Sequence, residues 1–245
     1  MKIQTIVLTI LAVSSLATFA CTSSACATSA FSTTANRQIN SYQSAGNPDP
    51  KRYPDHWWTA VAKEGAPKWE VLPQEAGPGE VILSKRNELG LLSNFAATPF
   101  VYSGTKYASL EGFWQMMKYP EGPSDPRATA KNVIWKFSRQ EVGQMTAFEA
   151  KSAGKLGEEN MKVLGIDWVT FENKQMEYRF LGRGDFYQVI QAAMLQKVLQ
   201  NPAVKEVLLA TGDLKLRPDH IQEPTAPAAW KYFDIWMELR AELQK

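Results

Sequence analysis

From residue 109 to the C-terminus, apolar side chains recur mainly at the three- and four-residue spacing of helices. Leu195, Val198 and Leu199 repeat in this way near the middle of that region. Asn201-Pro202 marks a boundary, because the residue before a proline is disfavoured in a helix. The pattern predicts a predominantly helical fold, with helices over residues 109–118, 126–137, 147–155, 168–181, 185–200, 202–210 and 228–244.

The chain before residue 109 carries the signals of a small β element. Residues 80–83 follow Gly77-Pro78-Gly79 and predict a short strand. Residues 100–102 and 106–107 flank Ser103-Gly104 and predict a hairpin. The chain has 245 residues, of which 44% are hydrophobic, enough to bury a core. We therefore expect an α+β fold, a predominantly helical single domain with a small β element, over residues 80–245.

The N-terminus has the features of a targeting segment. Lys2 supplies a positive charge, residues 6–20 form an apolar run, and Ala25-Cys26-Ala27 offers a small-x-small cleavage site. We interpret residues 1–27 as a signal peptide and expect an exported protein, periplasmic or secreted. An uncleaved anchor and a lipoprotein attached at Cys21 are the alternatives. The apolar run is too short and too rich in Ser and Thr for a membrane span.

Two stretches separate this segment from the predicted domain. Residues 28–50 are rich in Ser, Thr, Ala and Asn, and we interpret them as a flexible linker. Residues 51–79 form an irregular Trp/Pro-rich extension that holds Trp57, Trp58 and Trp69. We expect this extension to pack against the domain.

Composition excludes several kinds of site. Cys21 and Cys26 are the only cysteines, and cleavage after Ala27 removes both, so we expect neither thiol catalysis nor a cysteine zinc site. With His56 and His220 as the only histidines, we expect no metal and no cofactor. A net charge of +2 argues against strong nucleic-acid binding but is compatible with a small nucleotide. We expect no membrane contact beyond the signal peptide, and the sequence leaves the oligomeric state open.

The predicted helix over residues 109–118 has two stripes. Ser109 is a plausible N-cap, and the apolar face consists of Leu110, Phe113, Trp114 and Met117. A polar stripe of Glu111, Gln115 and Lys118 lies about 100° around the axis. Such a stripe is either an ordinary solvated face or the wall of a pocket at the margin of the core.

The same region resembles the signature of the NADAR (YbiA-like) family. The matching residues are Leu92-Ser93-Asn94-Phe95, Pro99, Gly104, Ser109-Leu110-Glu111, Trp114-Gln115 and Lys118. Weaker likeness continues at residues 150–154, Trp168, residues 207–211 and residues 237–240, so that the resemblance covers about residues 80–245. Residues 1–79 lie outside it.

Proteins of this family hydrolyse N-glycosidic bonds between a ribose and a nitrogen, in ribosylamino-pyrimidine phosphates or in ADP-ribose attached to guanine. The resemblance implies Glu111 and Lys118 as the catalytic pair. It also implies a substrate pocket lined by Asn94, Phe95, Gln115, Trp168 and Trp230. Glu111 would donate a proton to the departing nitrogen or activate water. Lys118 would attack an open-chain sugar as an imine-forming amine, or contact a phosphate as a cation.

The sequence departs from the family pattern in residues 216–231. The family has an acidic residue ahead of Trp-Gly, but here Trp230 is followed by Lys231, and the acid has no clean counterpart. Asp219 or Glu223 is the possible replacement. Three hypotheses follow: an exported N-glycosidase, a non-catalytic module that binds a nucleotide or ADP-ribose outside the cytoplasm, and a secreted interaction protein that presents Trp57, Trp58 and Trp69.

Overall fold

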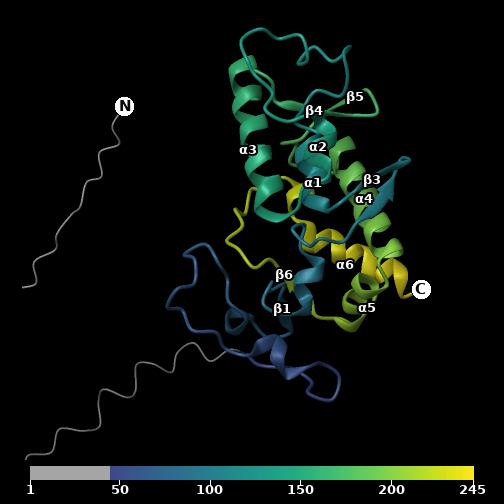
Figure 1. The fold of residues 1–245 in the computed structure, drawn as a ribbon. Coiled ribbons are helices and arrows are strands. Elements are labelled where there is room, and N and C mark those ends of the chain that lie inside the picture. Colours follow the sequence, from purple (N-terminus) through teal and green to yellow (C-terminus); the bar gives the residue numbers. More distant parts are fainter. Residues whose placement is uncertain (1–44) are drawn as a thin grey trace, which may run out of the picture. The chain divides into compact units, whose positions relative to one another are not determined.

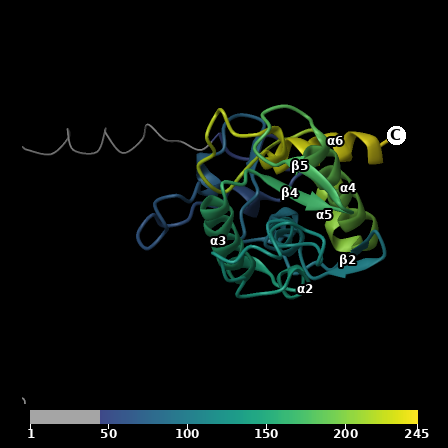
Figure 2. The same ribbon diagram turned by 90° about the horizontal axis from the view of Figure 1, so that it is seen from above.

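In the computed structural model, which describes residues 45–245, α1 is a short central helix (Figure 1). Both views place the β4–β5 hairpin between α3 and α4, and Figure 1 shows α1 between the same two helices (Figures 1 and 2). The helices are α1 Leu110–Met116, α2 Arg139–Gly143, α3 Ala147–Leu164, α4 Asp185–Gln200, α5 Pro202–Ala210 and α6 Tyr232–Leu243. The short 3-10 helices are η1 Asp55–Trp58, η2 Pro73–Glu75, η3 Glu88–Leu92 and η4 Ala228–Trp230.

The strands form three separate pairs within the described residues. β1 (Glu80–Ile82) runs parallel to β6 (Lys215–Arg217), with Val81 opposite Leu216. β2 (Phe100–Tyr102) and β3 (Thr105–Tyr107) form one hairpin, and β4 (Trp168–Phe171) and β5 (Lys174–Glu177) form another. Mixed helix and strand content confirms the expected α+β class, and residues 45–245 belong to one compact unit.

Several predicted elements are confirmed. The strand at 80–83, the hairpin turning at Ser103-Gly104, and the helices 185–200 and 202–210 all occur as expected. The helix expected at 147–155 continues to Leu164 and ends at Gly165, whose φ of +67° is the left-handed conformation that favours glycine at helix ends. The segment 228–244 is divided into η4 and α6.

The helix predicted over 168–181 is wrong, because this segment forms the β4–β5 hairpin. Glu172 and Asn173 have φ values of +51° and +63°, which is the conformation of a two-residue turn whose twist matches paired strands. Asn tolerates this region better than most residues do. Met176 is buried between exposed neighbours, as a strand with period two requires.

The helix predicted over 126–137 is also wrong. Arg127 lies there with its side chain fully buried, and its backbone N–H donates to Asp125 Oδ1 at 2.9 Å instead of entering a helical ladder. Trp135 Nε1 donates to the Arg127 carbonyl at 3.0 Å. These tertiary contacts override the helical composition of the segment, and the helix of this region is α2 instead.

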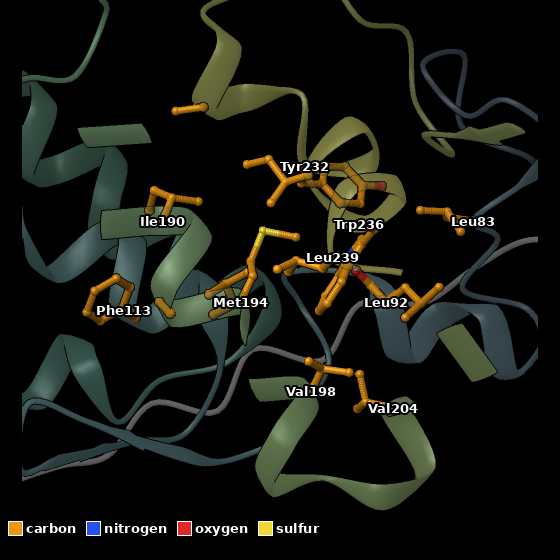
Figure 3. Close-up of a cluster of buried hydrophobic side chains, with 14 of the residues drawn as sticks. Leu83, Leu92, Phe113, Ile190, Met194, Val198, Val204, Tyr232, Trp236 and Leu239 are labelled. Carbon is orange, nitrogen blue, oxygen red and sulfur yellow. Dashed lines mark hydrogen bonds between the residues drawn. The ribbon is translucent and has the colours of Figure 1, made fainter. Parts of the chain in front are cut away.

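The core brings the C-terminal helices onto the loop that precedes α1. Figure 3 shows Trp236 and Leu239 of α6 beside Leu92, with Met194 and Val198 of α4 in the same cluster. Trp236 Nε1 donates to the Leu92 carbonyl at 2.7 Å, and Lys197 Nζ donates to the Ser93 carbonyl at 2.8 Å. The two residues that precede Asn94 are therefore held by α6 and α4.

The extension over residues 51–79 contributes to this core. Trp57 and Trp58 are buried, and their indole N–H groups donate to Glu88 Oε1 and to the Glu80 carbonyl. Two of the three tryptophans thus have no free surface, which weakens the interaction-protein hypothesis. Trp69 is the exception, with 47% of its surface exposed. Asn47, inside the stretch interpreted as linker, donates to the Tyr53 carbonyl.

The predicted signal peptide over residues 1–27, both cysteines and most of the predicted linker lie outside the described residues. Among residues 45–245, no helix combines the length and apolarity needed to cross a membrane.

Candidate functional site

The predicted polar stripe of α1 forms one wall of a cavity of about 500 Å³, a size typical of small-molecule sites. The other walls come from the segment before α1, from α3, from the end of β5, from residues 220–232 and from the extension. The lining residues are Trp69, Lys85, Ser93, Asn94, Phe95, Glu111, Trp114, Gln115, Lys118, Phe148, Lys151, Glu158, Tyr178, His220, Ile221, Gln222, Glu223, Trp230 and Tyr232.

The start of α1 is fixed by a cap and by a close backbone approach. Ser109 Oγ accepts a hydrogen bond from Gly112 N at 2.9 Å and donates to the Met145 carbonyl at 2.8 Å. A Cβ at Gly112 would lie 2.5 Å from that carbonyl, so only glycine fits there. The Glu111 N–H donates to the Asn94 carbonyl at 2.9 Å, which joins the two walls of the cavity.

Glycines on α3 make room for the α1 side chains. A Cβ at Gly154 would lie 1.8 Å from Gln115 Oε1, and a Cβ at Gly157 would lie 3.2 Å from Lys118 Cβ. Both glycines sit inside a helix, where glycine costs about 1 kcal/mol relative to alanine. Without side chains at these two positions, Gln115 and Lys118 can pack closely against α3.

Glu111 is a buried carboxyl. It is 7% exposed, and its Oε1 accepts a hydrogen bond from Gln115 Nε2 at 2.8 Å. Burial raises the pKa of Glu111 above its ordinary value, because desolvation penalises the charged form. The bond from Gln115 and the charges of Lys151, Lys118 and Lys85 oppose this shift without cancelling it. Glu111 therefore keeps its proton to a higher pH than an exposed glutamate does.

Lys118 is a buried amine whose pKa moves in the opposite direction. It is 6% exposed, and burial lowers its pKa below the ordinary lysine value. Glu158 Oε2 accepts from Lys118 Nζ at 3.2 Å, and this carboxylate and that of Glu111 raise the pKa in part. Desolvation has a larger effect on the pKa of Lys118 than these two carboxylates have, so the pKa stays below its ordinary value.

Two buried oxygen atoms in this cavity have no hydrogen-bond partner. They are Asn94 Oδ1 and Gln115 Oε1, the only such side-chain atoms in the part of the chain that the structure describes. Buried acceptors are nearly always satisfied in folded proteins, because an unmet one costs about 1–3 kcal/mol. Both atoms accept hydrogen bonds, so a bound group with hydroxyl or N–H donors would satisfy them.

Aromatic rings form much of the remaining wall. Trp230 stacks on Tyr178 with ring centroids 6.4 Å apart, and its Nε1 donates to the Tyr178 carbonyl at 3.2 Å. Lys118 Nζ lies 5.7 Å from the centroid of the Tyr178 ring. The Nζ atoms of Lys85 and Lys151 lie 5.3 and 5.8 Å from the centroid of the Phe95 ring. Flat rings beside ammonium groups suit a ligand that combines a planar base with an anion.

The cavity brings together most of the residues expected from the sequence. Glu111, Lys118, Asn94, Phe95, Gln115, Trp230 and Glu223 all line it. Trp168 does not; it lies in β4, where the Arg127 guanidinium sits 4.8 Å from its ring centroid. Asp219 is not among the lining residues either, since its carboxylate is engaged by Lys85 and by His220 Nδ1. Of the two candidate replacement acids, only the exposed Glu223 reaches the cavity.

Among the cavity residues that the sequence did not predict are four that carry charge or a hydroxyl beside Glu111 and Lys118: Lys85, Lys151, Glu158 and Tyr178. Lys151 and Glu158 are seven residues apart on α3, which is helical spacing for one face. Carrying the predicted helix beyond residue 155 would have placed them together. Tyr178 was hidden by the wrong helix over 168–181, and Lys85 carried no local signal. In the described part of the chain, no three His, Cys, Asp or Glu side chains are grouped to hold a metal ion.

Comparison with known proteins gives one structural match. No protein-family model matches the chain, and no curated protein matches it significantly. The NMR structure of the E. coli protein YbiA is similar to this chain with a TM-score of 0.42 and 20% sequence identity, covering 66% of this chain and 82% of that one. YbiA is the type member of the family that the sequence motif resembles. At this identity and TM-score it assigns neither an activity nor site residues.

Proposed function

We propose that the protein is an N-glycosidase, a hydrolase that cleaves the bond between a ribose and the nitrogen of a base or amine. One observation carries the proposal. A carboxyl with a raised pKa and an amine with a lowered pKa, both buried, line a single cavity with aromatic walls. Titratable groups whose environments move their pKa values toward each other are candidates for acid and base roles in a functional site.

In the hydrolytic step, the carbon–nitrogen bond at the anomeric carbon breaks while Glu111 gives its proton to the departing nitrogen. Positive character develops on the sugar, and the carboxylate that remains stabilises it. Water then adds to the anomeric carbon and returns one proton to Glu111, so that the enzyme is regenerated. The orphan oxygens of Asn94 and Gln115 would accept hydrogen bonds from sugar hydroxyls and orient the ring.

Lys118 has two possible roles in this scheme. As a neutral amine, it attacks the open-chain sugar carbon, expels the leaving amine, and forms an imine that water later hydrolyses. As an ammonium, it neutralises a ligand phosphate. Its lowered pKa favours the first role, while its contact with Glu158 favours the second.

The second candidate function is a binding module that holds a nucleotide or ADP-ribose without cleaving it. The observation in its favour is that Asp219, one possible replacement for the family acid, is occupied by Lys85 and His220. Both candidates share the ligand class, a small ribosylated compound or nucleotide. They differ in whether Glu111 completes the proton transfer.

The proposal includes export, because of the predicted signal peptide. An exported enzyme would meet free or protein-linked ribosylated compounds outside the cytoplasm. The intact mass of the exported protein tests this part, since a chain that begins near Thr28 is expected. A mass that retains Met1, or a lipid on Cys21, would contradict it.

The activity is tested by incubating the mature protein with a panel of ribosylated bases and ADP-ribose conjugates. Chromatography of the released base should show turnover of at least one member. Binding without release would favour the module over the enzyme.

The role of Lys118 is tested by adding borohydride during turnover. An imine would leave a covalent sugar adduct on Lys118, visible by peptide mass mapping. Lys118→Arg keeps the charge but cannot form an imine, so it should lose turnover, whereas Lys155→Arg at an exposed position of α3 should not. An active Arg variant, with no adduct in the wild type, would leave Lys118 as an electrostatic contact.

A further inference from the structure

The cavity changes character from its floor to its mouth. Glu111 and Gln115 at the floor are 7% and 8% exposed, and the Lys85 side chain is 35% exposed. Three exposed lining residues are large and apolar: Trp69 at 47%, Phe148 at 60% and Ile221 at 68%. The cavity therefore runs from a buried acid and amide at its floor to a mouth with large apolar side chains, where the exposed Lys85, Lys151 and Glu223 add charge.

The rim is assembled from three distant segments: the extension, the first turn of α3 and the loop after β6. Single exposed apolar residues are ordinary on protein surfaces. Here three exposed apolar residues line the same cavity, and a contiguous apolar patch of this kind marks a contact site.

Trp69 is held in place by its backbone and its neighbour. Its carbonyl accepts from Ile221 N at 3.1 Å, and Val71 N donates to the Asp219 carbonyl at 3.0 Å. Glu70 binds the Arg86 guanidinium through two hydrogen bonds of 2.8 and 2.7 Å. A large ring left half-exposed on such a braced segment is pre-organised for a partner, because little freedom remains to be lost on binding.

Phe148 is braced as well. Its ring meets the Phe95 ring edge to face, with centroids 5.1 Å apart. The preceding Ala147 has a φ of +47°, a conformation that costs a non-glycine residue about 1 kcal/mol or more. The chain thus enters α3 through a strained residue that sets the direction of Phe148.

Lys85 and Lys151 lie over the same Phe95 ring, at 5.3 and 5.8 Å from its centroid. Lys85 pairs with Asp219, whereas Lys151 forms no salt bridge within residues 45–245. These two ammonium groups present positive charge beside the Phe95 ring to a ligand that enters the cavity.

We propose that Trp69 and Phe148 form a mouth subsite that receives the heteroaromatic ring of a nucleotide, with its phosphates at Lys85 and Lys151 and its distal ribose at Glu111. A nucleoside diphosphate ribose joins a ring, an anion and a sugar, and the cavity offers a partner for each: exposed aromatic rings, ammonium groups beside Phe95 and the buried Glu111. The inference rests on the proposed function for the sugar end. It gives the extension over residues 51–79 a role in ligand selection.

The test compares two ligands that differ at the mouth. ADP-ribose carries the ring, and ribose 5-phosphate lacks it. By calorimetric titration, Trp69→Ala should weaken ADP-ribose binding by about 5- to 30-fold, because stacking of a base on an aromatic ring is worth about 1–3 kcal/mol and this ring is half-exposed. Binding of ribose 5-phosphate should stay within about twofold of the wild type, a difference of less than 0.5 kcal/mol.

Trp69→Phe should restore most of the ADP-ribose affinity, and Phe148→Ala should repeat the selective loss. Phe180→Ala is the matched control, since Phe180 is 48% exposed and does not line the cavity. Unchanged ADP-ribose affinity in both alanine variants would overturn the subsite while the proposed function stands. Equal losses for both ligands would overturn it too. If the wild type binds neither ligand, the proposed function fails together with the subsite.

Discussion

Two buried polar regions adjoin α1, and they differ in whether their polar groups are paired. The first is the Glu111 cavity. The second, the Arg127 network, consists of Asp125, Arg127, Arg139 and Thr170 beside the C-terminal end of the helix. Both place charged groups where water is scarce. Only the cavity leaves acceptors unpaired, which separates a site built to receive something from one built to hold the fold.

In the Arg127 network every charge has partners. The Arg127 guanidinium donates to Asp125 Oδ2 at 2.7 Å, to Thr170 Oγ1 at 2.6 Å and to the Met117 carbonyl at 3.1 Å. Arg139 Nη1 donates to the Tyr119 carbonyl at 2.9 Å. Burial raises the pKa of Asp125, but hydrogen bonds led by Arg127 outweigh it and leave the pKa below its ordinary value. These cations satisfy carbonyls that the end of α1 leaves open.

The largest effect that we expect comes from a change in the Glu111 cavity, and it is an effect on catalysis. Glu111→Gln removes the proton donor, so turnover should fall by about 10²- to 10⁴-fold, the usual contribution of a general acid. Folding should remain intact, because the amide replaces a carboxyl that is costly to bury. Product release and thermal melting measure the two effects. Glu149→Gln, on an exposed position of α3, is the control. Turnover at the wild-type rate would make Glu111 structural.

The next effect belongs to the network. Arg127→Ala should lower the free energy of unfolding by about 3–5 kcal/mol, because it leaves Asp125 buried without its partner. Denaturant titration measures the loss, with the exposed Lys155→Ala as a control. A loss below about 1 kcal/mol, the worth of an exposed ion pair, would show that the network contributes little.

A smaller effect should follow when a side chain is added at Gly154, where α3 packs against Gln115 of α1. Gly154→Ala puts a Cβ against Gln115 Oε1, so the Gln115 side chain must move and its bond to Glu111 is lost. We expect a loss of stability of about 1–3 kcal/mol from overpacking, together with weaker ADP-ribose binding. Gly122→Ala, where nothing lies within 4 Å of the added Cβ, should change neither. A stabilised Gly154→Ala with normal binding would contradict this account of the wall.

The smallest effect concerns pH. The pKa of Glu111 is raised in the folded state, so native protein keeps a proton that the unfolded chain releases once the pH exceeds the ordinary value of 4.5. The wild type should therefore lose stability relative to Glu111→Gln as the pH rises from 4.5 through the raised pKa. Denaturant titrations of both proteins between about pH 4 and 8 measure the difference. If the wild type instead gains stability relative to Glu111→Gln as the pH rises, the pKa of Glu111 is lowered in the folded state and not raised.

Sequence patterns predicted the elements whose signals are local. The turn at Ser103-Gly104 and the boundary at Asn201-Pro202 depend on backbone preferences of the residues themselves. The cap at Ser109 and the stripe of Glu111, Gln115 and Lys118 are equally local, so the floor of the cavity was visible in the sequence.

What the sequence did not predict depends on contacts between distant residues. The loop around Arg127 is held by partners as remote as Thr170, and no pattern within residues 126–137 reports this. Trp69 and Lys85 reach the cavity only because Glu70 binds Arg86 and Asp219 binds Lys85. The turn at Glu172-Asn173 was detectable in principle, since asparagine tolerates left-handed backbone, but helical spacing in the segment concealed it.

The parallel pairing of β1 with β6 has a consequence for the order of events during folding (Figure 1). Arg217 meets Glu80 across 137 residues of chain, and closing so long a loop carries an entropic cost before any contact compensates it. Contacts of such high sequence separation form slowly. The loop after β6, which brings His220, Ile221 and Glu223 to the cavity, follows that pairing directly. A chain synthesised only as far as β5 therefore contains Trp69 and Phe148 but lacks the loop whose Ile221 N–H binds the Trp69 carbonyl, so the mouth is completed only after β6 has been made.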